Sequence, residues 1–126
     1  MIVRFDKEKE VAQVALRASE LLPILNEKEL KDPLGVKSLW RPEYGAYMIE
    51  GTPGKPYGHF DQFNDVQANM RYRRKELSNL LASNESVMTI TSFPRLGCPN
   101  FSYPSFEVRP DDPDCAARSN YFPGKQ

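Results

Sequence analysis

Two glutamates, Glu43 and Glu50, are the side chains of this sequence best suited to hold a metal ion. They lie in an aromatic segment beside Tyr44, Tyr47 and Met48, where a bare carboxylate is costly unless it is exposed or ligated. Oxygen-only ligands suit magnesium, which is a hard cation. In one regular strand, however, the two glutamates would face opposite sides and lie roughly 23 Å apart at about 3.3 Å per residue. Spacing alone therefore favours two separate surface glutamates over a shared site.

A basic run, made of Arg71, Arg73, Arg74 and Lys75, is the second candidate for a binding site. At about 100° per residue of a helix, Arg73 points away from the other three side chains. The run is therefore interpreted as a solvated helix face. The 17 basic and 17 acidic residues also leave no net charge that would attract nucleic acid or an anionic membrane.

The remaining reactive residues form no recognisable catalytic pattern. The two glycines of the segment Gly51 to Lys55 are too closely spaced for a phosphate-binding loop. His59 is the only histidine, and we expect it to lie in a loop, so triads and histidine-rich metal sites are excluded. Cys98 and Cys115 are not part of a C-x-x-C pair and are predicted to be structural thiols.

The first third of the chain is predicted to form a hairpin followed by a helix. The short β-prone runs Ile2 to Phe5 and Val11 to Leu16 flank a charged stretch, which is typical of an antiparallel hairpin. Ser19 is a suitable cap for a helix that extends to Leu30, provided that Pro23 lies in its first turn. The sequence Asp-Pro-Leu-Gly at 32–35 then ends that helix.

The second part of the chain is predicted to hold a strand, a long helix and another strand. The segment Trp40 to Glu50 is β-prone and leads into a loop rich in glycine and proline. Apolar residues at helical spacing predict a long amphipathic helix from Asp61 to about Ser83, and Val87 to Thr91 is β-prone. From about Pro94 the density of prolines predicts irregular chain. The result is an α+β class with antiparallel pairing and an unfinished sheet.

No segment of the sequence is suited to a membrane or to secretion. The longest apolar stretch, at 21–25, is far shorter than the roughly 20 residues that span a bilayer. The first ten residues are strongly charged, unlike a secretory signal. We therefore expect a cytoplasmic protein.

Three segments of the chain resemble segments of the catalytic subunit of eukaryotic glutamate–cysteine ligase, and they occur in the same order as in that family. They are LWRPEYGAYMIEGTPGKPYG from Leu39 to Gly58, VQANMRYRRKE from Val66 to Glu76, and TITSFPRLGCPNF from Thr89 to Phe101. The resemblance extends over nearly all of the chain but covers only an N-terminal part of the family's longer subunit. In the family, the methionine that aligns with Met1 follows an acidic Trp-Gly-Asp-Glu-x-Glu-Tyr motif that contributes metal-binding carboxylates.

The resemblance implies a fold and a domain organisation. The family's fold is a curved antiparallel sheet of the glutamine-synthetase type, so residues 1–126 are expected to form a single incomplete domain with one long amphipathic helix and a proline-rich irregular tail from about residue 94. The family's later segments, which hold further metal ligands and the substrate arginines, are absent from this sequence. The chain is therefore expected to supply only part of an active site.

The resemblance also implies a reaction, the first step of glutathione biosynthesis. ATP phosphorylates the γ-carboxylate of glutamate, and the amine of cysteine then displaces phosphate to form an amide, with magnesium neutralising phosphate charge. Glu43 and Glu50 match the family's magnesium-ligand positions, so the resemblance implies that both bind metal and are not simple surface glutamates. Arg73, Arg74 and Arg95 lie in family-like segments and are candidates for substrate contact, although a structural ion pair is the preferred interpretation of each.

Two hypotheses follow for what this chain does. In the first, it is part of a full-length ligase that binds glutamate, cysteine and ATP and pairs in some organisms with a regulatory modifier subunit. In the second, it is a short non-catalytic product that acts as a binding or regulatory module. Reading the transcript in both directions would separate them, because the upstream acidic motif and the downstream segments are expected only in the first.

Overall fold

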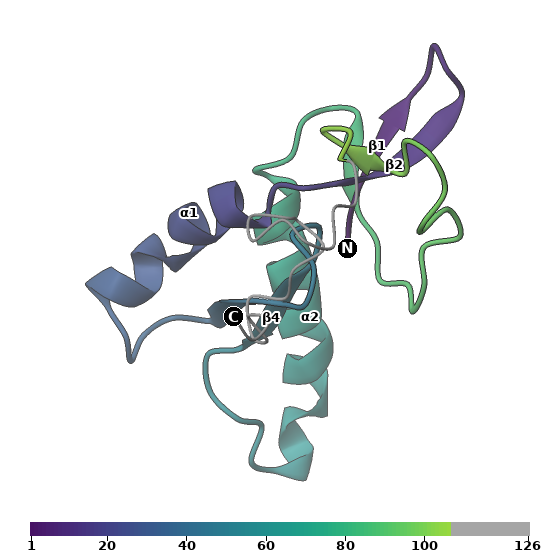
Figure 1. Ribbon diagram of the computed structural model, residues 1–126. Helices are drawn as coiled ribbons and strands as arrows, with labels where there is room; N and C mark the ends of the chain where they lie inside the picture. The colour runs from purple at the N-terminus through teal and green to yellow at the C-terminus, as the bar shows by residue number, and fades with distance from the viewer. Residues whose placement is uncertain (107–126) are drawn as a thin grey trace, which may run out of the picture.

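The computed structural model describes residues 1–106, which contain two sheets and two α-helices (Figure 1). The mixed content and the antiparallel sheets confirm the predicted class. In chain order the elements are β1 (Ile2–Asp6), β2 (Val11–Ala15), α1 (Ala18–Lys31), β3 (Ser38–Pro42), β4 (Ile49–Pro53), the 3-10 helix η1 (Phe60–Gln62), α2 (Phe63–Ser78), β5 (Glu85–Val87) and β6 (Ser102–Tyr103).

The larger sheet has the strand order β5-β1-β2-β6 and contains the predicted hairpin. Strands β1 and β2 pair antiparallel with Val3 opposite Val14. The turn between them places Glu10 at a φ of 52°, and Asp6 Oδ1 accepts a hydrogen bond from Lys9 N at 3.1 Å. Strand β6 pairs with β2 in parallel, so the sheet is not purely antiparallel.

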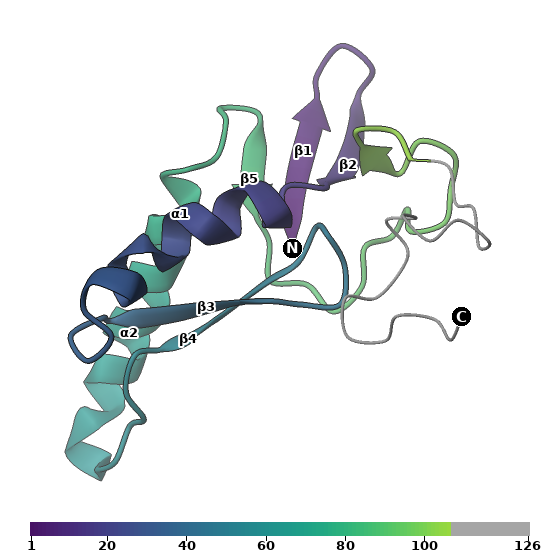
Figure 2. The same ribbon diagram turned by 60° about the vertical axis from the view of Figure 1, so that its left-hand side comes forward.

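The smaller sheet is the hairpin of β3 and β4, which lies between the two helices (Figure 2). Helix α1 packs on β3 and α2 packs on β4. Trp40 on β3 is buried, and it belongs to the same core as Leu21 and Leu25 of α1 and Leu77 of α2. This core fixes the hairpin relative to both helices.

The two helices differ from the predictions in their ends and in their burial. Helix α1 begins at Ala18, no side chain caps it, and Pro23 lies inside it, so the predictions of a Ser19 cap and of a first-turn proline were wrong. Helix α2 ends at Ser78 and has 16 residues against 14 in α1, so one dominant long helix is not confirmed. Its expected apolar face is largely uncovered, because Phe63 and Met70 are 75% and 58% exposed.

The strand expected at Val87 to Thr91 lies instead at Glu85–Val87. It pairs antiparallel with β1, with Ile2 opposite Val87. β-Propensity favours the residues after Val87, but a strand exists only where a partner strand supplies hydrogen bonds. The ladder with β1 reaches its last pair at Met1 and Met88.

The irregular segment after Pro94 and the cysteines are described only in part. Cys98 is a free, exposed cysteine in that segment. Cys115 and the tail beyond residue 106 lie outside the described residues. His59 lies in the loop just before η1, as predicted. Within residues 1–106, neither helix has the length and apolar character that crossing a membrane requires.

Candidate functional site

The segment that carries Glu43 and Glu50 is a hairpin and not the single strand predicted from its sequence. Residues 43–48 reverse the chain between β3 and β4, and Met48 N donates a hydrogen bond to Gly45 O at 2.8 Å. Gly45 lets the Tyr47 ring lie close to the backbone in this reversal, because a Cβ there would lie 2.8 Å from the ring and displace it. The β-prone residues on both sides of this glycine hid the reversal from pattern reasoning.

The hairpin brings the two glutamates closer together than a single strand would. The last pair of the β3–β4 ladder joins Pro42 to Ile49, Glu43 follows Pro42 just beyond β3, and Glu50 follows Ile49 within β4. Two Cα–Cα steps of about 3.8 Å and one cross-strand spacing of about 5 Å place their Cα atoms at most about 13 Å apart, instead of roughly 23 Å. The interpretation of this segment as one strand was therefore wrong.

The two carboxylates differ in their surroundings. Glu43 is half-buried, and its Oε1 accepts a hydrogen bond from Tyr44 N at 3.0 Å. Glu50 is exposed, and within residues 1–106 its carboxylate makes no hydrogen bond or ion pair. Its cross-strand neighbour Arg41 is paired with Glu29 on α1, with Nη2 to Oε1 at 2.6 Å. The oxygens of Glu50 and one oxygen of Glu43 are thus available to a cation.

These two glutamates are not a complete metal site by themselves. No group of three or more histidine, cysteine, aspartate or glutamate side chains within residues 1–106 could hold an ion. Magnesium prefers six oxygen ligands. The chemistry of Glu43 and Glu50 fits that ion, and its remaining ligands would have to come from substrate, water or other parts of a longer protein.

Arg73 and Arg74 on α2 contact the backbone of neighbouring strands. Arg73 Nη1 donates a hydrogen bond to the carbonyl of Gly51, the residue after Glu50. Arg74 Nη2 donates to Val87 O at 2.6 Å. Arg73 therefore holds the strand that presents Glu50. Both arginines thus donate to backbone carbonyls and not to acidic side chains, which differs from the structural ion pairs expected from the sequence.

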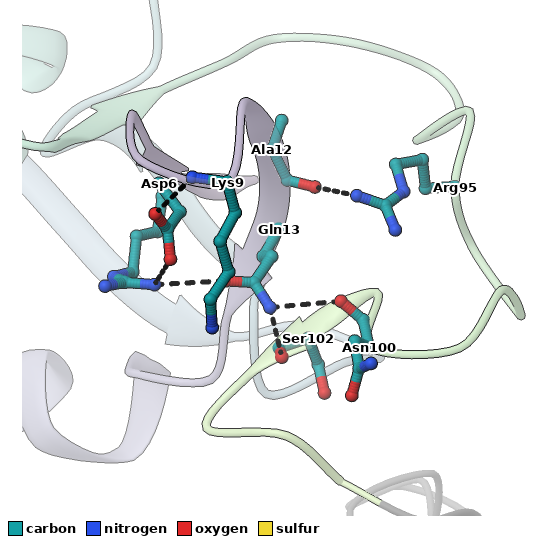
Figure 3. A network of polar contacts seen from close by, with 8 residues as sticks. Asp6, Lys9, Ala12, Gln13, Arg95, Asn100 and Ser102 are labelled. Carbon is teal, nitrogen blue, oxygen red and sulfur yellow. Dashed lines mark hydrogen bonds and ion pairs between the residues drawn. The ribbon is translucent and has the colours of Figure 1, made fainter.

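Arg95 lies on the loop that follows β5, and Figure 3 shows its guanidinium pointing toward Ala12 of β2. Its guanidinium reaches Ala12 O on β2 and Pro99 O, both at 3.4 Å. On the same side of β2, the buried Gln13 donates through Nε2 to Asn100 O at 3.0 Å and to Ser102 O at 3.2 Å. Arg95 thus takes part in attaching this loop to the larger sheet.

The residue that sequence reasoning missed is Glu76, which lies at the end of the family-like segment from Val66. Its side chain is only 11% exposed and connects α2 to β3 and α1. Oε2 accepts hydrogen bonds from Ser38 Oγ at 2.5 Å and from Trp40 Nε1 at 3.0 Å. Oε1 pairs with Lys28 Nζ at 2.6 Å and accepts from Tyr72 at 3.2 Å. No local signal marks Glu76, because Lys28, Ser38 and Trp40 are distant in sequence.

The charge of Glu76 is stabilised although the carboxylate is largely buried. Burial favours the neutral form, but the hydrogen bonds from Lys28, Ser38 and Trp40 outweigh burial and hold the pKa of Glu76 below its usual value. The same contact raises the pKa of Lys28, through its hydrogen bonds to Glu76 and Tyr72. Glu76 is therefore an ionised brace that ties the hairpin to both helices.

Comparison with known proteins identifies the family. The family model described as glutamate-cysteine ligase matches residues 1–126. This chain belongs to the glutamate–cysteine ligase family. It is 49% identical over 125 residues to the human glutamate–cysteine ligase catalytic subunit and 48% identical over 124 residues to that of Mus musculus, covering 98% of this chain in each case. It is also 49% identical over 98 residues to the glutamate–cysteine ligase of Dictyostelium discoideum.

The match covers only a small part of each relative. The chain spans 19% of the length of the human and mouse catalytic subunits and 16% of the Dictyostelium ligase. Most of each relative therefore lies outside the matched region. No solved structure gives a significant match to this chain.

Proposed function

We propose that these residues form part of an ATP-dependent glutamate–cysteine ligase and that the β3–β4 hairpin supplies magnesium ligands to its active site. The observation that carries this proposal is the β3–β4 hairpin, which brings Glu43 and Glu50 to within about 13 Å of each other at their Cα atoms, in a chain of this family. In the proposed reaction, ATP phosphorylates the γ-carboxylate of glutamate and the amine of cysteine displaces phosphate to form the amide.

The hairpin residues have distinct tasks in this proposal. Bound magnesium would neutralise phosphate charge during phosphoryl transfer. The Tyr44 backbone N–H orients the Glu43 carboxylate and leaves its second oxygen available. Arg73 holds the carbonyl of Gly51 and so fixes the backbone next to Glu50. A site held within fractions of an ångström needs such supporting contacts.

The relatives and the size of the match support the remaining parts of the proposal. The human and mouse relatives are named catalytic subunits, which supports pairing with a regulatory modifier subunit. Because the chain spans 19% of those relatives, residues 1–126 are proposed to be an incomplete domain of a curved, glutamine-synthetase-like sheet. Further metal ligands and substrate contacts would then come from outside these residues.

Substitution of the two glutamates in the full-length ligase tests the proposal. Glu43→Gln and Glu50→Gln keep the shape of the side chain and remove its charge. Loss of one comparable electrostatic contact lowers the rate by a factor of roughly 100–1,000. We expect a loss of this size in γ-glutamylcysteine formation from ATP, glutamate and cysteine, partly relieved by excess magnesium.

The control for this experiment is Glu27→Gln, since Glu27 is 63% exposed on α1 and, among the described residues, its carboxylate pairs only with Lys31 of the same helix. Glu76, although also a glutamate, is unsuitable because it braces the fold. Near-normal rates and an unchanged magnesium dependence in Glu43→Gln and Glu50→Gln would contradict the proposal and show that both residues are ordinary surface glutamates.

A further inference from the structure

The indole ring of Trp40 occupies the space beside β4 where residue 51 has no side chain. Trp40 on β3 pairs directly with Gly51 on β4, and residues paired in this way have their side-chain positions on the same face of a hairpin. A Cβ added at Gly51 would lie 2.5 Å from Cζ3 of the Trp40 ring and 3.0 Å from Cε3 and Cη2. The six-membered ring of the indole therefore lies against the Gly51 backbone, an approach that a larger residue would prevent.

The other side of the same indole is held by Glu76. Trp40 Nε1 donates a hydrogen bond to Glu76 Oε2 at 3.0 Å. Trp40 is 3% exposed, and an indole nitrogen can only donate, so this carboxylate fixes the orientation of the ring. The second oxygen of Glu76 is paired with Lys28 Nζ at 2.6 Å. The indole is thus fixed between a restrained carboxylate and the backbone of β4.

Helix α2 restrains Gly51 at a second point. Arg73 Nη1 donates to the carbonyl of Gly51. Arg73 and Glu76 are three residues apart in α2, so they lie on the same side of the helix, and α2 packs on β4 (Figure 2). One side of this helix therefore acts on Gly51 twice, directly through its carbonyl and indirectly through the indole.

The residue next to Gly51 is Glu50, whose own side chain is unsupported. Side chains alternate along a strand, so Glu50 points to the face of the hairpin opposite to Trp40. The Glu50 carboxylate is exposed and makes no hydrogen bond or ion pair within residues 1–106. A functional side chain must be held within about 0.5 Å of its productive position. The backbone of β4 is therefore the part of the structure that positions Glu50.

We propose that Trp40 and Glu76 are positioning residues for Glu50. This inference rests on the proposed function, since it takes Glu50 as a magnesium ligand. Glu76 fixes the indole, the indole fixes the backbone at Gly51, and that backbone determines where the Glu50 carboxylate stands. Residues that orient a metal ligand from behind typically change metal affinity 10–100-fold when they are replaced, and a path through the backbone favours an effect of about tenfold.

Binding of Mn²⁺ to the full-length ligase tests this inference, because Mn²⁺ accepts the same oxygen ligands as magnesium. Electron paramagnetic resonance measures free Mn²⁺ without turnover. Trp40→Phe removes the indole N–H but keeps an aromatic ring, and it should weaken Mn²⁺ binding about tenfold. Gly51→Ala displaces the ring from its other side and should also weaken binding. The matched control, Ser38→Ala, removes the second donor to the same Glu76 oxygen, leaves the indole in place and should not change the affinity.

Combined substitutions distinguish positioning of Glu50 from a general loss of structure. In a Glu50→Gln background, Trp40→Phe should change Mn²⁺ affinity by less than about twofold, because residues that act through one another are not additive. In a Glu43→Gln background, which keeps Glu50, the loss caused by Trp40→Phe should remain.

Three results would overturn the inference. They are normal Mn²⁺ affinity in both Trp40→Phe and Gly51→Ala, an equal loss from Trp40→Phe with and without Glu50→Gln, and a loss in Ser38→Ala as large as that in Trp40→Phe. Failure of the proposed function is distinguishable, because Glu50→Gln alone would then bind Mn²⁺ as tightly as the unmodified ligase, and the inference would fail with it.

Discussion

Replacement of Glu76 with alanine tests whether a buried carboxylate holds the hairpin between the helices. The change removes the acceptor of two donors that are themselves buried, Ser38 at 7% and Trp40 at 3% exposure. The lost ion pair with Lys28 matters less, because that lysine is 65% exposed. A solvent-exposed partner regains hydration, whereas a buried donor cannot.

The size of the effect follows from these two donors. Each buried donor left without an acceptor costs about 1–3 kcal/mol, so the two donors together should make Glu76→Ala lower the free energy of unfolding by roughly 2–6 kcal/mol. Glu76→Gln retains one acceptor oxygen and should lose less. Since domains are stable by only about 5–15 kcal/mol, a loss of this size is easily measured.

Urea unfolding of the 126-residue chain, followed by the fluorescence of its single tryptophan, measures this loss. Trp40 is the tryptophan concerned, so the signal reports on the site itself. Glu27→Ala is the control, because Glu27 is 63% exposed and should change stability by less than about 0.5 kcal/mol. Equal unfolding midpoints for Glu76→Ala and Glu27→Ala would refute the assignment of Glu76 as a brace.

Four further results are expected. The pKa of Glu76 is lower in the folded state than in the unfolded state, so its carboxylate stabilises the fold above the unfolded pKa and loses this effect as the pH falls through the folded pKa. The difference in unfolding free energy between the original chain and Glu76→Gln should therefore become smaller below about pH 4.5. Gly54→Ala should lower the free energy of unfolding in urea by about 1–3 kcal/mol, because the added Cβ would lie 1.9 Å from the Val36 carbonyl oxygen. Gly58→Ala should leave stability unchanged, because a Cβ there would have no atom within 4 Å. In the full-length ligase, Arg73→Ala should raise the magnesium concentration needed for half-maximal turnover, since it frees the backbone beside Glu50, and Lys75→Ala should leave that concentration unchanged. The isolated 126-residue chain should form no γ-glutamylcysteine in the same assay, and measurable product would contradict the proposal that it supplies only part of the site.

The local elements could be predicted where neighbours in the sequence decide them. Two β-prone runs around a charged turn were enough for the β1–β2 hairpin, which the structure confirms at Ile2–Asp6 and Val11–Ala15. Apolar spacing located both helices, but not their ends, because the ends depend on packing. Three peculiar segments also sufficed for the resemblance to glutamate–cysteine ligases, which the family match confirms.

Only the tertiary structure decided how distant residues meet. The reversal between β3 and β4 places Glu43 near Glu50, and its signal in the sequence is a glycine that β-prone residues surround. The polar contacts of Glu76 join it to residues up to 48 positions away, and one groove of the fold is lined by Met1, Met48, Met70 and Met88, which are far apart in sequence. Periodicity relates residues within about one helical turn or one strand pair, so it cannot predict contacts that form only when separate elements pack.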